Sequence, residues 1–186
     1  MKSKRNIRQP EPASIVVTRR GRALIEKDGK ILLCQRIGTD YWYLPGGKSN
    51  PDETISRALT REIEEELGRK CRAGELVGVC EHLFWDKRRK TAVNEINLVF
   101  AVDFSKQLPD KVVSKEKHLR FKWVHLDDCR MGSFNLLPPG LNLHLSAYRP
   151  VRTAFYFVAT TDRNSRNHNT YFCAPQKRLE PESKSR

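Results

Sequence analysis

The sequence lacks several features that would assign it to whole classes of protein. It has no apolar run of about 18 residues, the length at which a helix can cross a bilayer. No hydrophobic stretch follows the basic N-terminal residues, which argues against a secretory signal peptide. The five cysteines include no Cys-x-x-Cys pair, so neither a disulfide framework nor a zinc site is predicted. We therefore expect a cytoplasmic protein with reduced thiols and no membrane partner.

Acidic residues are scarce relative to basic ones. The chain has 35 Lys and Arg against 22 Asp and Glu, a formal net charge of +13. Such a charge suits a nucleic acid or a phosphate-rich substrate as partner. However, basic and aromatic residues do not interleave as they do in RNA-binding modules. We interpret the basic run 87–90 as a solvated hairpin tip, with a phosphate-facing role as the alternative.

The length of 186 residues suits one domain. Residues 1–12 are basic and contain two prolines, so we expect a flexible arm there. Residues 13–160 carry the apolar patterns and are predicted to form a single domain. Residues 161–186 are polar and basic, and we expect a mobile tail. A homodimer is compatible with the sequence.

Short apolar segments alternate with one long helical pattern, which predicts an α/β fold. Asp28-Gly29 predicts a two-residue hairpin. The helix is expected from about Glu53 to Leu67, with Asp52 as N-cap and Gly68 as C-cap. A short second helix is expected near 141–147. Strands are predicted at 14–18, 22–27, 30–36, 41–44, 76–85, 93–104, 119–126 and 151–160, with Ile96, Leu98, Phe100 and Val102 as the buried row of the sixth.

Three glutamates on the long helix form an unusual cluster. Glu62, Glu65 and Glu66 stand at i, i+3 and i+4, so their carboxylates share one face and repel each other. We expect this face to point outward, opposite an apolar row that enters the core. A divalent cation would remove the repulsion, and oxygen ligands suit a hard cation such as Mg²⁺. The alternative is a solvated acidic helix face.

The spacing of these residues resembles the signature of the Nudix hydrolases. Gly47 is followed after five residues by Glu53, and after seven more by Arg61-Glu62. Glu65-Glu66 and Gly68 complete the pattern. The departure is Arg69, where the family has an aliphatic residue; it lies beyond the carboxylates and affects local packing more than chemistry.

The resemblance implies the Nudix fold, a mixed β-sheet sandwiched between helices (α/β/α). It also implies a divalent-metal-dependent pyrophosphohydrolase that cleaves a diphosphate linkage in a nucleoside diphosphate derivative or nucleoside triphosphate. The cofactor would be Mg²⁺ or Mn²⁺. Its ligands would be Glu62, Glu65, Glu66 and the backbone carbonyl of Gly46, while Arg61 would pair with Glu53 and hold the loop against the helix.

Other candidates lie outside the signature. Glu116 precedes a strand in a region where many family members place another catalytic acid; Glu95 is a second candidate and Glu81 a third. Trp42 and Tyr43 adjoin the glycine turn and could stack on a nucleobase, although core packing is the alternative reading of each.

The signature does not specify the group attached to the nucleoside diphosphate. A small nucleotide is the favoured substrate. The basic arm suggests an RNA 5′-end pyrophosphohydrolase as the first alternative. The second is a non-catalytic Nudix module that senses a nucleotide, but a sensor has no need of all three glutamates.

Overall fold

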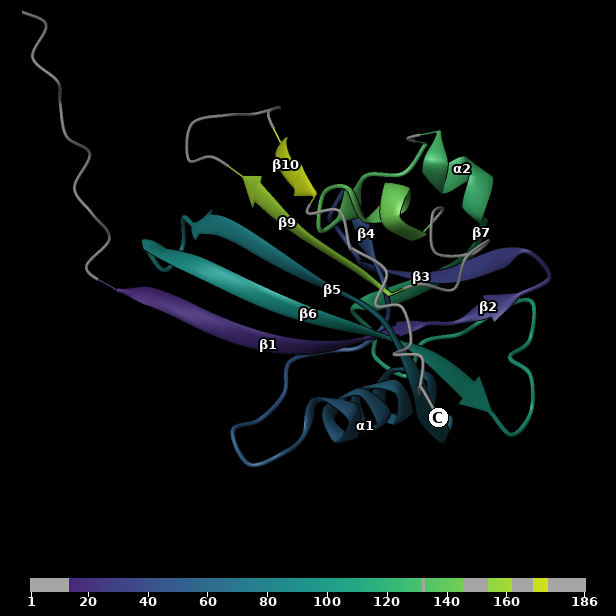
Figure 1. Ribbon diagram of the computed structural model, residues 1–186. Coiled ribbons are helices and arrows are strands. Elements are labelled where there is room, and N and C mark those ends of the chain that lie inside the picture. The colour runs from purple at the N-terminus through teal and green to yellow at the C-terminus, as the bar shows by residue number, and fades with distance from the viewer. Residues whose placement is uncertain (1–13, 132, 146–153, 162–168, 174–186) are drawn as a thin grey trace, which may run out of the picture.

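A computed structural model describes residues 14–131, 133–145, 154–161 and 169–173. The strands form two β-sheets, which lie between helices on opposite sides of the molecule (Figure 1). The larger sheet has the strand order β1-β6-β5-β9-β10, with parallel pairs β1/β6 and β5/β9 and antiparallel pairs between the others. Its strands are β1 (Ile15–Leu24), β5 (Cys71–Asp86), β6 (Thr91–Phe104), β9 (Phe155–Thr161) and β10 (Asn169–Cys173).

The smaller sheet is built around one central strand, which pairs with short strands on one side and a longer antiparallel strand on the other. Its members are β2 (Glu26–Lys27), β3 (Lys30–Arg36), β4 (Trp42–Tyr43), β7 (Leu119–His125) and β8 (Leu136–Leu137). The hairpin predicted at Asp28-Gly29 joins β2 to β3, and both of its residues have positive φ, 47° and 78°. Such a turn matches the twist of the paired strands.

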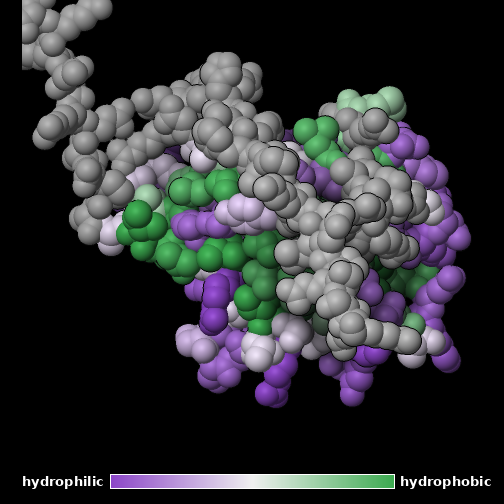
Figure 2. Space-filling model, viewed as in Figure 1, coloured by the Kyte–Doolittle hydropathy of each residue, from purple (hydrophilic) through white to green (hydrophobic). Residues whose placement is uncertain are grey.

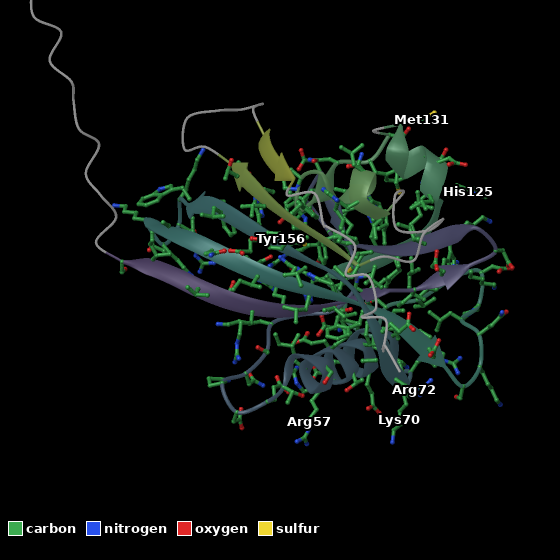
Figure 3. All side chains as sticks on the ribbon, viewed as in Figure 1. Arg57, Lys70, Arg72, His125, Met131 and Tyr156 are labelled. Atoms are coloured by element: carbon green, nitrogen blue, oxygen red, sulfur yellow. The ribbon has the colours of Figure 1, made fainter. Side chains whose placement is uncertain are left out.

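The long helix α1 (Ile55–Leu67) covers one face of the larger sheet. Its apolar residues Ala58, Leu59, Ile63 and Leu67 are buried, as the sequence predicts, and Arg57 points away from the sheet (Figure 3). Gly68 ends the helix with φ 65°, the left-handed conformation that glycine adopts without strain. The predicted start is wrong: Thr54, rather than Asp52, is the N-cap, because its side chain accepts the Arg57 N–H.

Two hydrophobic clusters explain the layers. One contains Leu59 and Ile63 of α1 together with Leu32 of β3. The other contains Leu33 of β3, Phe157 of β9 and Leu141, which opens a helical turn at 141–145. That turn and α2 (Leu126–Arg130) lie on the side of the molecule away from α1 (Figure 1). Neighbouring residues of β3 thus enter different clusters, and the expected α/β/α layering is confirmed.

Three expectations about strands need correction. The segments 14–18 and 22–24 belong to one strand, β1, because its pairing with β6 is continuous. In β6 the predicted row is buried only in part: Val102 belongs to the cluster beside α1 and Phe100 packs against it, whereas Asn97 and Val99 on the other face are buried more fully. Strand β10 lies inside the segment 161–186 that was expected to be a tail because most of its residues are polar or basic.

Polar and apolar residues divide along the surface beside α1. Figure 2 shows hydrophilic side chains beneath the helix and a band of apolar side chains over the strands above it. The large exposed hydrophobic residues of β1 and β5 are Ile15, Val17, Leu76 and Leu83. Among the described residues no helix is long and apolar enough to span a bilayer. The predicted arm of residues 1–12 lies outside the described ranges, as does most of the predicted tail.

Candidate active site

The glycine turn between β4 and α1 is attached to the edge of the larger sheet. Backbone N–H groups of β1 donate to its carbonyls, from Ala23 to Pro45 at 2.9 Å and from Gly21 to Gly47 at 3.1 Å. A Cβ atom on Gly46 would lie 2.3 Å from the Gly21 carbonyl oxygen, so only glycine allows this approach. The turn therefore lies directly over the C-terminal half of α1.

Two of the three clustered glutamates line a cavity at this turn. Glu66 is buried, and its Oε2 accepts the Gly46 N–H at 3.1 Å. Burial raises the pKa of Glu66 to about 8, although the Gly46 N–H and the positive charge of Arg22 oppose the rise. Glu62 lies against Gly47, where an added Cβ would stand 2.2 Å from its carboxylate. The prediction that this whole face points outward is wrong for Glu66, because the turn covers it.

Arg61 connects the loop to the helix as expected. Its Nη2 lies 2.8 Å from Glu53 Oε1 and its Nε lies 3.3 Å from Oε2, so the pair is bidentate. Its Nη1 donates to Glu62 at 3.0 Å and to Glu65 at 3.1 Å. The hydrogen bonds from Arg61 lower the pKa of Glu53. Arg61 thus offsets the repulsion within the cluster, and it draws Glu65 away from the cavity into a separate surface hollow.

A buried arginine holds the turn from the opposite side. Arg22 Nη1 donates to the carbonyls of Gly46 at 2.8 Å and Leu44 at 3.2 Å, and its Nε donates to Asn97 Oδ1 at 3.0 Å. Its guanidinium lies over the Tyr43 ring at 5.1 Å. Burial lowers the pKa of Arg22. The Gly46 carbonyl, expected to face a metal, therefore accepts a hydrogen bond from Arg22.

The cavity has a volume of about 740 Å³ and opens between the two sheets. Glu116 lines it together with Glu62 and Glu66, because Lys115 N–H donates to the Glu66 carbonyl at 2.8 Å and holds the neighbouring loop in place. Tyr43 also lines it. Trp42 does not: it packs edge-on against Phe134 and beneath Arg120, so the core-packing alternative describes it.

The cavity wall formed by the larger sheet is cationic and aromatic. Of its members, the sequence pointed only to Glu95, as a candidate acid, and to Lys87, within the basic run 87–90. The members of this wall are Arg20, Arg22, His82, Phe84, Trp85, Lys87 and Glu95, joined from β3 and the turn by Arg36 and Lys48. Glu81, the third candidate acid, instead accepts hydrogen bonds from Asn94 and Tyr156. Because successive side chains of a strand point to opposite faces, the sequence indicates only that residues 18, 20 and 22 lie on one face of a strand. It does not indicate that this face lines a cavity.

The oxygen donors near the turn match the chemistry of a hard divalent cation, since Glu62, Glu66 and Glu116 offer only carboxylates. Within the described residues, no three Asp, Glu, His or Cys side chains converge as a ready-made metal site. The carboxylates do not converge because Arg61 forms ion pairs with Glu65 and with one oxygen of Glu62. The carboxylates are therefore of the right chemical type to bind a divalent cation, but ion pairs with Arg61 engage Glu62 and Glu65.

This arrangement agrees with comparisons with known proteins. The NUDIX domain profile matches residues 15–142. The chain belongs to the Nudix family. The Nudix fold is also shared with solved structures: a mutator MutT protein of Bacillus halodurans (TM-score 0.64, 17% identity, 86% of this chain and 99% of that one) and the ORF135 protein of E. coli (TM-score 0.56, 28% identity, 74% and 94%).

Curated relatives match this Nudix chain over a shorter segment. A CTP pyrophosphohydrolase of Escherichia coli is 49% identical over 59 residues, which are 30% of this chain and 44% of that protein. An RNA pyrophosphohydrolase of Pseudomonas putida is 46% identical over 48 residues, 26% of this chain and 30% of the relative. The chain thus spans less than half the length of either relative. Both of these relatives are pyrophosphohydrolases.

Proposed function

We propose that the protein is a divalent-metal-dependent pyrophosphohydrolase of nucleoside di- or triphosphates and their derivatives. The observation that carries this proposal is the meeting of Glu62, Glu66 and the glycine turn at the mouth of one cationic cavity. The carboxylates and the basic wall face the same space. A polyphosphate can therefore contact both at once.

The cation would be Mg²⁺ or Mn²⁺, held by Glu62, Glu65 and Glu66 with the Gly46 carbonyl. When bound, it supplies Lewis-acid polarisation of the phosphate and of a water molecule. Arg61 would release Glu65 to this site while its bidentate contact with Glu53 keeps the loop on the helix. Arg22 would keep the Gly46 carbonyl in place through its hydrogen bond.

The remaining groups would bind and orient the substrate. Lys48, Arg36 and Lys87 line the cavity and would attract the phosphates. The Tyr43 ring would contribute to the base or ribose pocket. Glu116 would accept the proton of the attacking water at its carboxylate, since it lines the same cavity as Glu62.

The decisive experiment is a substrate panel. Nucleoside triphosphates, nucleoside diphosphates and nucleotide sugars are each incubated with Mg²⁺, with Mn²⁺ or with EDTA, and the products are identified by mass spectrometry. We expect cleavage of a diphosphate linkage only with metal. Folded protein that cleaves no member of the panel, or that acts equally well in EDTA, would refute the proposal.

A second candidate is hydrolysis at the 5′ end of RNA. The hairpin tip between β5 and β6 favours it: Lys87 lines the cavity, and Arg88 and Lys90 are exposed beside it. Triphosphorylated RNA in the same panel separates the two, because a small-nucleotide enzyme should prefer the free nucleotide.

A further inference from the structure

Arg20 lines the cavity, and one hydrogen bond fixes its orientation while its terminal amino groups remain available to a ligand. Its Nε donates to Glu95 Oε2 at 2.5 Å, and 31% of its side chain is exposed. Within the described ranges, neither of its terminal amino groups has a protein acceptor. By contrast, the Nε and Nη1 donors of Arg22 are engaged with Asn97 and the turn carbonyls, and its side chain is only 11% exposed. Arg20 is therefore the better placed of the two to receive an anion.

Glu95 fixes that orientation from within the sheet. It is 14% exposed and is contacted by Arg20, by Arg22 at 3.9 Å and by the Asn97 amide at 3.3 Å. Burial alone would raise the pKa of Glu95, but attraction to Arg20 and Arg22 outweighs it, and the pKa lies below its ordinary value. An ionised carboxylate committed to two arginines is an anchor, and not the catalytic acid considered from the sequence.

The position of Arg20 relative to the turn points to its ligand. Arg20 forms a backbone bridge with Lys48, which directly follows the two glycines. Both residues line the cavity that contains Glu62 and Glu66. A guanidinium held at Nε presents its terminal N–H groups as a fork, a geometry that matches the oxygens of a phosphate.

We propose that Arg20 binds a phosphate group of the substrate and that Glu95 is the positioning residue that orients it. This inference rests on the proposed function, because the cavity must take a diphosphate. In this proposal Glu95, on β6, acts by holding Arg20 and does not itself contact the substrate.

The strand offers a matched control. Arg19 is adjacent to Arg20 and carries the same charge, but it is exposed and lies on the opposite face of β1. Arg20→Gln and Arg19→Gln therefore change the net charge equally. Only the first removes the fork from the cavity.

The test measures binding of inorganic pyrophosphate in the presence of Mg²⁺ by calorimetry, alongside steady-state nucleotide hydrolysis. We expect Arg20→Gln to weaken pyrophosphate binding by about ten- to a hundredfold, the usual effect of losing a charged hydrogen bond. Arg19→Gln should stay within about twofold of wild type. Hydrolysis by Arg20→Gln should show a raised KM, with a smaller change in kcat.

The Glu95 role is tested by coupling. Glu95→Gln should weaken pyrophosphate binding less than Arg20→Gln does, and the double variant should bind no more weakly than Arg20→Gln alone. A merely structural role would give additive losses and would overturn the positioning role. If Glu95→Gln does not fold, the comparison of Arg20→Gln with Arg19→Gln decides the inference.

The two proposals fail differently. If wild type hydrolyses nucleotides and Arg20→Gln binds pyrophosphate normally, the inference is wrong and the proposed function stands. If Arg20 governs pyrophosphate binding but no nucleotide is hydrolysed, the proposed function is wrong and the anion site stands. Absence of both pyrophosphate binding and hydrolysis in wild type would overturn both.

Discussion

Single residues of the glutamate cluster differ in their surroundings despite their identical chemistry. Glu66 is buried under Gly46, Glu65 contacts Arg61 near the surface, and Glu64 on the same helix is exposed. The spacing from Glu62 to Glu66 indicated that they were neighbours. Which of them the turn would cover depends on a contact that is distant in sequence.

This difference leads to a residue-level prediction. Glu66→Gln and Glu65→Gln should each lower turnover by orders of magnitude while the circular dichroism spectrum stays unchanged, because each removes a proposed ligand and little packing. Glu64→Gln is the matched control and should retain wild-type turnover in the same Mg²⁺ assay. Full activity in both Glu65 and Glu66 variants would show that the metal assignment is wrong.

His82 provides a second residue-level prediction. It is 8% exposed, it hydrogen-bonds Thr161 Oγ1 at 3.0 Å, and burial lowers its pKa below the ordinary value of 6.5. Protonation therefore favours the unfolded state. Neutral His82 therefore contributes its full stabilisation of the folded state above pH 6.5. This contribution is lost as the pH falls through the lower pKa of His82 in the folded state, and the free energy of unfolding decreases by at most about 1.4 kcal/mol per pH unit for one proton.

The measurement is the free energy of unfolding in urea at pH 7.5 and 5.5. His82→Gln keeps a hydrogen-bonding side chain without the titration, so it should lose less stability between the two values than wild type loses. Equal losses in wild type and His82→Gln would contradict the prediction.

At the level of elements, the turn between β4 and α1 carries the geometry of the site. Gly46 faces backbone, with φ 113° and the Gly21 carbonyl against it, whereas Gly47 faces the end of the Glu62 side chain. The sequence indicated a turn with close approach to the glutamates. It did not indicate that the two glycines meet different partners, since β1 had not been placed beside them.

The two glycines should therefore respond differently to alanine. Gly46→Ala should lower the melting temperature by several degrees, because backbone cannot move aside cheaply and the positive φ is strained. Gly47→Ala should reduce kcat/KM with a smaller loss of stability, because it displaces the Glu62 carboxylate. Thermal unfolding and kinetics of both variants check this; equal melting temperatures in the two would contradict it.

Prediction of elements was most accurate where local patterns determine them. The Asp28-Gly29 hairpin, the apolar row of α1 and its Gly68 C-cap follow from neighbours in sequence. The first turn of α1 was placed too early because Asp52 and Thr54 are both good N-caps, and the Thr54 contact with Arg57 decides between them. Strand β10 depends on pairing with β9, and its sequence Asn-Thr-Tyr-Phe-Cys is too short to predict a strand within a segment that is otherwise polar and basic.

At the level of the whole molecule, the net charge of +13 separates the two candidate functions. Deleting residues 1–12 should weaken RNA binding if the substrate is an RNA 5′ end, because basic contacts with phosphates supply most of that affinity. It should leave hydrolysis of small nucleotides unchanged. Binding of RNA by full-length and truncated protein across a salt series measures this, and a salt-independent affinity would count against the RNA function.

The sequence by itself determined the family and the helix with its glutamates, because these depend on spacing within one short segment, and the family resemblance in turn implied the pairing of Arg61 with Glu53. The tertiary structure decided the burial of Glu66, the contact of Arg22 with Gly46, and the meeting of Arg20 with Glu95 across 75 positions. A charged residue in a strand has the same local pattern whether its face meets solvent or a cavity. Only the packing of the two sheets distinguishes these cases, and it turned the residues of β1 and β6 into one wall of the site.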